Sequence, residues 1–168
     1  MEKILYDVDV LVAGGGPAGV AAAVGAARQG KRTMLIEKNG YCGGMGVVNG
    51  AFCGYYTSAK NGVLSQLVYG FAGEFYDEMK RRGGVSTPYP FGDTYIVPND
   101  YIVWKETADD FLEKANVSVL FHSFAADVVK REDELTHVVV QNKSGRFLIQ
   151  ARRFVDATGD GDLCAKAG

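Results

Sequence analysis

Short apolar runs and small-residue stretches alternate over the first 36 residues of the chain. Residues 8–13 form an apolar run that ends at Gly14, which predicts a buried strand. An Ala-rich stretch follows over residues 17–29 and is closed by Gly30, which predicts a helix. Residues 33–36 are a second apolar run. Two strands joined by one helix within about 30 residues predict a parallel, right-handed βαβ unit.

The middle of the chain predicts one long helix and a loop. Segment 37–59 is too rich in glycine for regular structure to be expected. Segment 62–82 predicts a core-facing helix that ends at Gly83-Gly84. Residues 85–99 contain three prolines and predict a loop around a short strand at 94–97. The apolar positions at helical spacing in segment 62–82 are Leu64, Leu67, Val68, Phe71, Phe75 and Met79.

The last third of the chain predicts one helix and then several strands. Asp100 is a suitable N-cap for a helix to about residue 115, with a buried stripe that includes Val103, Thr107, Phe111 and Leu112. Residues 117–121 predict a strand. A small antiparallel meander is predicted over residues 125–130, 135–142 and 146–154, with a turn at 142–145. The final strand runs to Asp156, and residues 157–162 predict a loop.

Composition favours one folded domain and excludes several classes of partner. The chain has 168 residues, of which 47% are apolar and 23% charged, so it can bury a core. With 18 basic and 20 acidic side chains and no basic block, it carries no footprint for nucleic acid or an anionic membrane. Residues 10–27 lack charge, but their Gly, Ala and Pro17 content argues against a membrane span. Three cysteines form no paired pattern, so we expect a reducing cytoplasm and no metal site.

Glycine is the chemical signal of the N-terminal part, because 12 of the 22 glycines lie within the first 54 residues. Gly14-Gly15-Gly16-Pro17-Ala18-Gly19 fits the G-x-G-x-x-G pattern between a predicted strand and a predicted helix. Gly14 permits the tight turn, Gly16 lets a pyrophosphate approach the backbone, and Gly19 lets the helix pack closely on the strand. The unpaired N–H groups of the helix N-terminus attract the phosphates.

An acidic residue ends the second predicted strand. Glu37 follows Gly19 by 18 residues, the spacing at which a carboxylate accepts hydrogen bonds from an adenosine ribose. A carboxylate there also repels a 2′-phosphate, which argues against NADP. These residues alone allow either FAD or NAD.

Two longer segments carry a family resemblance: DVDVLVAGGGPAGVAAAVGAARQGKRTMLIEKNGYCGGMG at 7–46 and FVDATGDGDLCAKAG at 154–168. They resemble the FAD-dependent oxidoreductase family of two-dinucleotide-binding-domain flavoproteins. The resemblance implies an α/β fold: a Rossmann-like, glutathione-reductase-type FAD-binding domain with a parallel sheet, flanking helices and an antiparallel β-meander. Glu37-Lys38 before Gly43-Gly44-Met45, the meander and the Ala157–Asp160 turn favour FAD over NAD.

The resemblance also implies where the cofactor would lie. Residues Gly14 to Gly19 would hold the pyrophosphate, and Glu37, followed by Lys38, would hold the adenosine ribose. Gly43-Gly44-Met45 would pass close to the ribityl chain and the flavin. The backbone of Ala125 would meet the adenine edge. Thr158, Gly159 and Asp160 would close over the dinucleotide from the far side.

The function implied is FAD-dependent oxidoreduction of a small-molecule substrate, with hydride passing through flavin N5. No catalytic residue and no substrate can be named, and a homo-oligomer is left open. Family members carry a further substrate-binding region and a returning segment that completes the flavin site. Residues 1–168 are therefore expected to be an incomplete FAD-binding domain, inactive alone.

Two alternatives stay open. A thiazole-forming synthase with the same fold would bind a related dinucleotide as substrate and would need a sulfur-donor cysteine, which none of Cys42, Cys53 and Cys164 matches. A non-catalytic nucleotide-binding fragment is the other. Cys42 and Cys53 also lack the C-x4-C spacing of a flavin-linked dithiol, and His122 and His137 have no second ligand in sequence reach. The tyrosines are expected to pack.

Overall fold

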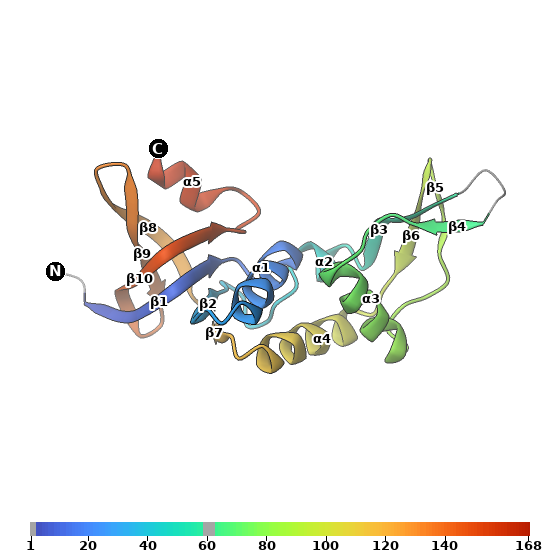
Figure 1. Ribbon diagram of the computed structural model, residues 1–168, viewed down its shortest axis with the longest axis horizontal. Coiled ribbons are helices and arrows are strands. Elements are labelled where there is room, and N and C mark those ends of the chain that lie inside the picture. Colours follow the sequence, from blue (N-terminus) through green and yellow to red (C-terminus); the bar gives the residue numbers. More distant parts are fainter. Residues whose placement is uncertain (1–2, 59–62) are drawn as a thin grey trace. The chain divides into compact units, whose positions relative to one another are not determined.

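The computed structural model describes residues 3–58 and 63–168, and these form two compact units (Figure 1). Unit 1 is drawn from Met1–Cys42 and Asp110–Gly168, and unit 2 from Gly43–Asp109. The organisation of residues 1–168 as one FAD-binding domain stays a prediction.

Unit 1 is built on a six-stranded sheet in the order β7-β2-β1-β10-β9-β8. Strands β7, β2, β1 and β10 pair in parallel, and β10, β9 and β8 pair antiparallel. The predicted α/β arrangement of parallel strands with an antiparallel meander is therefore confirmed. The elements of unit 1 are β1 (Ile4–Ala13), α1 (Pro17–Arg28), β2 (Thr33–Ile36), β7 (Ser118–Leu120), β8 (Phe124–Arg131), β9 (Glu134–Asn142), β10 (Gly145–Asp156) and α5 (Asp162–Ala167).

Strand β10 joins the two parts of this sheet. Residues 145–150 pair with β9, and residues 148–156 run parallel to β1 until Asp156 lies opposite Ala13. The predicted third meander strand and the predicted final strand are thus one continuous strand of 12 residues. The chain leaves the sheet after Asp156 beside the point where it leaves β1.

The sheet is buried at its centre, as its apolar runs predict. Leu11, Val12 and Ala13 of β1 are fully buried. Val20 and Val24 of α1 are also buried. Leu11 belongs to a core cluster that also includes Phe147, Ile149 and Leu163. Apolar packing therefore fixes the ends of β1, β2 and β10, after which the loops at Gly14, Glu37 and Ala157 begin.

Unit 2 contains a four-stranded antiparallel sheet in the order β4-β3-β6-β5. The expectation of irregular structure over 37–59 is wrong, because α2 and β3 lie within it; Ala59 itself lies outside the described residues. The loop expected over 85–99 contains β5 as well as the predicted strand. The elements are α2 (Met45–Val48), β3 (Ala51–Ser58), β4 (Leu64–Gln66), α3 (Phe71–Arg81), β5 (Tyr89–Phe91), β6 (Thr94–Pro98) and α4 (Tyr101–Lys114), whose last residues belong to unit 1.

A bulge explains why β3 escapes the apolar periodicity. The register between β3 and β6 shifts between Cys53 and Tyr56, and Gly54 has a φ of +69° there. Three residues of β3 there span a single step of β6, so two extra residues interrupt the ladder in mid-strand. The sequence pattern then no longer indicates a strand.

The helix predicted over 62–82 begins only at Phe71, and its first predicted residue, Gly62, lies outside the described residues. Gly70 precedes it with a φ of +68°, which interrupts a helix. Leu64, Leu67 and Val68 are accordingly exposed, although their spacing continues that of the buried helix residues. The predicted end is confirmed, since the N–H groups of Gly83 and Gly84 close the helix on the carbonyls of Lys80 and Met79.

Helix α4 begins as predicted. The Asp100 carboxylate accepts hydrogen bonds from the N–H groups of Ile102 at 2.7 Å and Val103 at 3.1 Å. Thr107 and Leu112 are buried on this helix, as is Trp104, which the prediction omitted.

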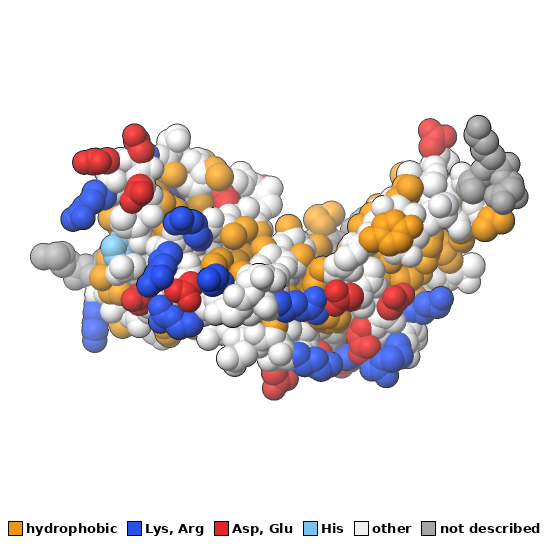
Figure 2. Space-filling view, viewed as in Figure 1, with side chains coloured by type: hydrophobic (Ala, Val, Ile, Leu, Met, Phe, Trp, Pro, Cys, Tyr) orange, Lys and Arg blue, Asp and Glu red, His pale blue; other side chains and the backbone are white. Residues whose placement is uncertain are grey.

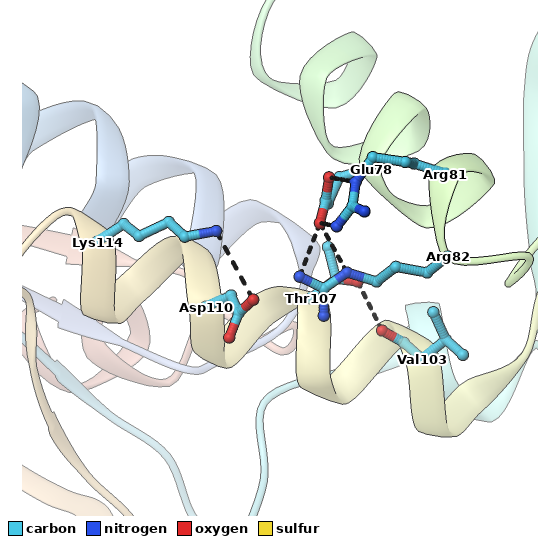
Figure 3. A network of polar contacts seen from close by, with 7 residues as sticks. All are labelled: Glu78, Arg81, Arg82, Val103, Thr107, Asp110 and Lys114. Carbon is cyan, nitrogen blue, oxygen red and sulfur yellow. Dashed lines mark hydrogen bonds and ion pairs between the residues drawn. The ribbon is translucent and has the colours of Figure 1, made fainter.

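A polar network lies on α3 in unit 2 (Figure 3). Glu78 accepts hydrogen bonds from Arg81 and from Arg82, each at 2.7 Å. These bonds, that of Arg81 foremost, lower the pKa of Glu78 to about 2. On α4, Thr107 donates to the carbonyl of Val103 at 2.7 Å. These contacts lie along α3 and α4 themselves.

On the face shown in Figure 2, Lys and Arg side chains are interspersed with Asp and Glu, as the balanced counts predict. Within residues 3–58 and 63–168, every helix is too short or too polar to span a bilayer.

Candidate functional site

The turn between β1 and α1 is compressed against the backbone around it. Gly14 has a φ of +100°, and its N–H donates to the Ile36 carbonyl at 2.8 Å. A Cβ added to Gly14 would lie 2.2 Å from the Ala157 carbonyl oxygen. Any side chain here would collide with backbone, so both the turn and the neighbouring strand end require glycine at this position.

The first turn of α1 packs directly on this turn. A Cβ added to Gly19 would lie 1.8 Å from the Gly14 carbonyl oxygen. That contact is the close helix-to-strand approach expected of the last glycine in the pattern. Gly16 is the N-cap and Pro17 begins the helix, so no capping side chain competes for the first N–H groups of α1. Pro17 and Ala18 are exposed.

Glu37 is held against the turn by three hydrogen bonds. Its Oε2 accepts from the N–H of Gly15 at 2.6 Å, and its Oε1 accepts from the backbone N–H and the side-chain amide of Asn39 at 2.7 and 2.8 Å. Only 6% of Glu37 is exposed. Its backbone is also fixed, because its N–H donates to Leu120 and its carbonyl accepts from Ser123. The carboxylate is therefore placed before any ligand binds.

Cys42 lies beneath the same turn. It is fully buried, and a Cβ added to Gly15 would lie 2.8 Å from its sulfur. Gly15 is thus required because the Cys42 sulfur and the Glu37 carboxylate occupy the space that a Cβ would need. The sequence showed Cys42 only as an unpaired cysteine and gave no signal of this contact.

A pocket opens at the carboxyl ends of β1 and β2, where ligands bind in open α/β sheets. It brings together five of the predicted cofactor residues: Gly14, Glu37, Lys38, Ala125 and Thr158. The other residues that line it are Ala13, Ile36, Ser123, Phe124 and Asp162. Segments far apart in sequence therefore meet at this pocket, and the roles of these residues stay predictions.

The loop after β10 is organised by Asp156, which the sequence analysis did not select as a site residue. Its carboxylate accepts from the Thr158 hydroxyl at 2.7 Å, from the Thr158 N–H at 3.2 Å and from the Cys164 N–H at 2.9 Å. Burial raises the pKa of Asp156, but the hydrogen bonds from Cys164 and Thr158 together lower it below its usual value. Gly159, with a φ of +90°, and Asp160 are exposed in the same loop.

The remaining predicted residues, Gly43, Gly44 and Met45, belong to unit 2. Gly44 combines a φ of +47° with a ψ of −130° immediately before α2, a backbone conformation that favours glycine. A Cβ added to the next glycine, Gly46, would lie 2.5 Å from the Trp104 ring. Their predicted place beside the ribityl chain and the flavin stays a prediction.

Both histidines and Tyr55 lie against other residues of the chain. The exposed His122 has its ring beside Gly40, and His137 contacts the Thr136 hydroxyl. Tyr55 is buried and stacks on Tyr76. The part of the chain that the structure describes contains no group of three His, Cys, Asp or Glu residues that could hold a metal ion.

Curated relatives match most of this chain but extend well beyond it. The thiamine thiazole synthase of Methanococcus vannielii is 26% identical over 163 residues, which cover 92% of this chain and 57% of that protein. The soluble pyridine nucleotide transhydrogenase of Chromohalobacter salexigens is 27% identical, over 92% of this chain and 31% of that protein. The chain thus spans 57% or less of the length of these two relatives.

Solved structures show the same fold. The THI4 protein of Thermovibrio ammonificans superimposes with a TM-score of 0.65 at 19% identity, over 95% of this chain and 61% of that chain. A geranylgeranyl bacteriochlorophyll reductase-like protein of Thermoplasma acidophilum gives a TM-score of 0.67 at 19% identity, over 97% and 42%. The predicted Rossmann-like flavoprotein fold is confirmed. A family model described as FAD dependent oxidoreductase matches residues 9–168, so the chain belongs to the FAD-dependent oxidoreductase family.

Proposed function

We propose that unit 1 binds the adenosine diphosphate half of FAD. The observation that carries this is the compressed Gly14–Gly19 turn, which presents the N-terminus of α1 next to a pocket lined by Glu37, Ala125 and Thr158. Uncapped helix N–H groups and glycine backbone suit a pyrophosphate, which needs donors and close approach. The residues present therefore fit the cofactor.

The Glu37 carboxylate favours a ribose without a 2′-phosphate next to this turn. A carboxylate offers about four lone-pair sites, and three are used by Gly15 and Asn39. One site on Oε2 is left for a ribose hydroxyl, whereas a 2′-phosphate would meet a negative charge. FAD and ADP satisfy this condition and NADP does not.

The rest of the assignment follows the resemblance. Lys38 and the Ala125 backbone line the adenosine side, and Gly43-Gly44-Met45 serves the flavin end. Thr158, Gly159 and Asp160 close over the dinucleotide from the far side. When bound, FAD supplies hydride transfer through its N5 atom. The residues of this chain bind and orient the cofactor and exclude water from it.

The matched relatives are longer than this chain, and the reaction proposed is that of the whole protein. We propose oxidoreduction of a small-molecule substrate in the cytoplasm, without nucleic acid or membrane partners and with a homo-oligomer left open. Residues 1–168 alone are expected to bind nucleotide without turnover.

Binding titrations test this function. The chain should bind ADP and FAD, and bound FAD should show the flavin absorbance bands. Gly16→Val should abolish binding of both while leaving the fold largely intact, because the new side chain occupies the space of the pyrophosphate. Gly25→Val is the matched control, since a Cβ on Gly25 meets nothing within 4 Å on the same helix. No binding by the unaltered chain, or unchanged affinity in Gly16→Val, would refute the proposal.

A thiazole synthase is the second candidate, favoured by the match to the synthase of Methanococcus vannielii over 92% of this chain. Such an enzyme would use a related dinucleotide as substrate. Because ADP, NAD and FAD share the adenosine diphosphate half, NAD binding much tighter than that of both ADP and FAD favours the synthase. Equal affinity for the three ligands is expected where only that half is held, and flavin absorbance of the purified chain then separates a flavoprotein from a plain nucleotide-binding fragment.

A further inference from the structure

The carboxylate of Asp156 is shared among donors of the loop that follows it. Its Oδ1 accepts both the hydroxyl and the N–H of Thr158, at 2.7 and 3.2 Å. Its Oδ2 accepts the N–H of Cys164 in α5, at 2.9 Å. One side chain thus ties the loop at its beginning and at its end.

Thr158 links Asp156 to the wall of the pocket. Its hydroxyl donates to Asp156 and accepts from the N–H of Asp162 at 2.9 Å. The direction of that hydroxyl is therefore fixed, because it has only one proton to give. Thr158 and Asp162 both line the pocket, so the orientation of this wall depends on Asp156.

Helix α5, whose Cys164 N–H donates to Asp156, is itself held in place by two contacts. Leu163 is 2% exposed and packs in the core of unit 1. The ammonium group of Lys130 donates to the Ala167 carbonyl at 2.5 Å, at the other end of the helix. Since α5 is held in the core, the hydrogen bond from Cys164 holds the Asp156 carboxylate in place as much as Asp156 holds the loop.

The charge of Asp156 argues against direct contact with a phosphate. A carboxylate beside a pyrophosphate would be repelled by it. Both carboxylate oxygens face donors of this chain, which neutralise part of that charge before any ligand binds. The group can order the wall of an anion site without presenting its charge to the anion.

We propose that Asp156 is a positioning residue for the adenine dinucleotide, acting through the Thr158 hydroxyl. This rests on the proposed function, because the affected ligand is the one assigned to the pocket. The effect is preorganisation: with Asp156 present, the loop holds its binding conformation before ligand arrives.

A double-mutant cycle on ADP affinity tests the proposal, with urea unfolding measured in parallel. Asp156→Asn keeps the shape but turns an N–H donor toward either the Cys164 N–H or Thr158. It should weaken ADP binding about tenfold. In the Thr158→Ser background, which keeps the hydroxyl, the same tenfold loss is expected. In the Thr158→Val background, Asp156→Asn should cost less than about twofold.

Asp127→Asn is the matched control, because its carboxylate also accepts a backbone N–H, that of Val128 at 2.9 Å, but does not line the pocket. It should leave ADP affinity unchanged. Equal losses from Asp156→Asn in the Ser and Val backgrounds, or a loss below about twofold in the unaltered background, would overturn the inference while leaving the proposed function standing.

Should Asp156→Asn fail to fold, the Thr158 variants decide alone. Thr158→Val should bind ADP more weakly than Thr158→Ser, since only serine can link Asp156 to Asp162. Equal affinity of the two overturns the inference. Absence of ADP binding in the unaltered chain overturns the proposed function and this inference together, so the two failures are distinguishable.

Discussion

Removal of the Glu37 carboxylate should weaken both the fold and the nucleotide site. Of its three hydrogen bonds, the one from the Gly15 N–H is buried, whereas Asn39 is exposed and can recover water. A hydrogen bond to a charged group contributes about 1.5 to 3 kcal/mol, and an unsatisfied buried donor costs about 1 to 3 kcal/mol. The loss of the Gly15 hydrogen bond therefore contributes most of the effect, and the loss of the Asn39 bonds contributes little. Glu37→Ala should lower the free energy of unfolding by about 2 to 3 kcal/mol.

The isosteric variant sharpens the argument. Glutamine has one acceptor oxygen, so Glu37→Gln can keep the buried Gly15 N–H satisfied and turn its own N–H₂ toward Asn39, which is exposed and can recover water. Its free energy of unfolding should therefore lie closer to that of the unaltered chain than that of Glu37→Ala does. A glutamine variant as unstable as the alanine variant would contradict the dominance of the Gly15 hydrogen bond.

Urea unfolding and ADP calorimetry measure the two effects. ADP binding should weaken by about 1.5 to 3 kcal/mol in Glu37→Ala if the carboxylate also accepts from the ribose. Glu113→Ala, an exposed acidic residue on α4, is the control and should change neither quantity appreciably. A change below about 0.5 kcal/mol in unfolding would refute the hydrogen-bond reasoning, and the same small change in binding would place Glu37 outside the site.

Three further predictions concern other contacts. Gly19→Ala places a Cβ 1.8 Å from a backbone carbonyl oxygen and should destabilise the fold by about 2 to 4 kcal/mol, whereas Gly25→Ala, with open space, should stabilise it in urea unfolding. The pKa of Glu78 is lowered from 4.5 to about 2 in the folded chain, so its contribution to the free energy of unfolding is present above pH 4.5 and should be lost as pH falls toward 2. Glu78→Gln should remove this part of the pH dependence of stability, and an unchanged dependence would contradict the prediction. The hydrogen bond to Asp156 raises the pKa of the Cys164 thiol, so Asp156→Asn should speed iodoacetamide labelling of Cys164 at neutral pH, with the other exposed cysteine as internal reference.

The fold of unit 1 could be predicted because its local and global signals agree. Residues 8–13 and 33–36 are apolar runs without competing periodicity, and residues 8–13 of β1 are buried or half-buried and all of β2 is buried, as such runs require. The meander strands follow turn residues closely, so β8 to β10 agree with their predicted bounds within a few residues.

Parts of unit 2 were not predicted because single glycines there interrupt the hydrophobic pattern around them. Gly54 lies in a bulge that interrupts the pairing of β3 with β6, and Gly70 stops an apolar periodicity from continuing as helix. Neither effect can be read from hydrophobic spacing, since glycine permits a positive φ without requiring it. The error in each element follows from that freedom.

The candidate site was predictable where one segment carries it and not where two segments meet. Glycines and Glu37 were found from spacing alone, but Asp156 and Cys42 matter through contacts set by tertiary structure. Asp156 depends on the register that pairs it with Ala13, and a slip of one residue would turn its side chain to the other face of the sheet.

The structure also changes the reason why Gly14 must be glycine. The pattern explains it by the tight turn, yet a side chain there would in addition collide with the Ala157 carbonyl, 143 residues later in the chain. The Ala157 N–H in turn donates to the Ala13 carbonyl at 2.8 Å, so the two segments continue the β1–β10 ladder beyond both strands. The glycine-rich turn and the loop after Asp156 are therefore two sides of one packed structure. A substitution at Gly14 should disturb Thr158, and through it the pocket wall, even where the turn itself tolerates the change.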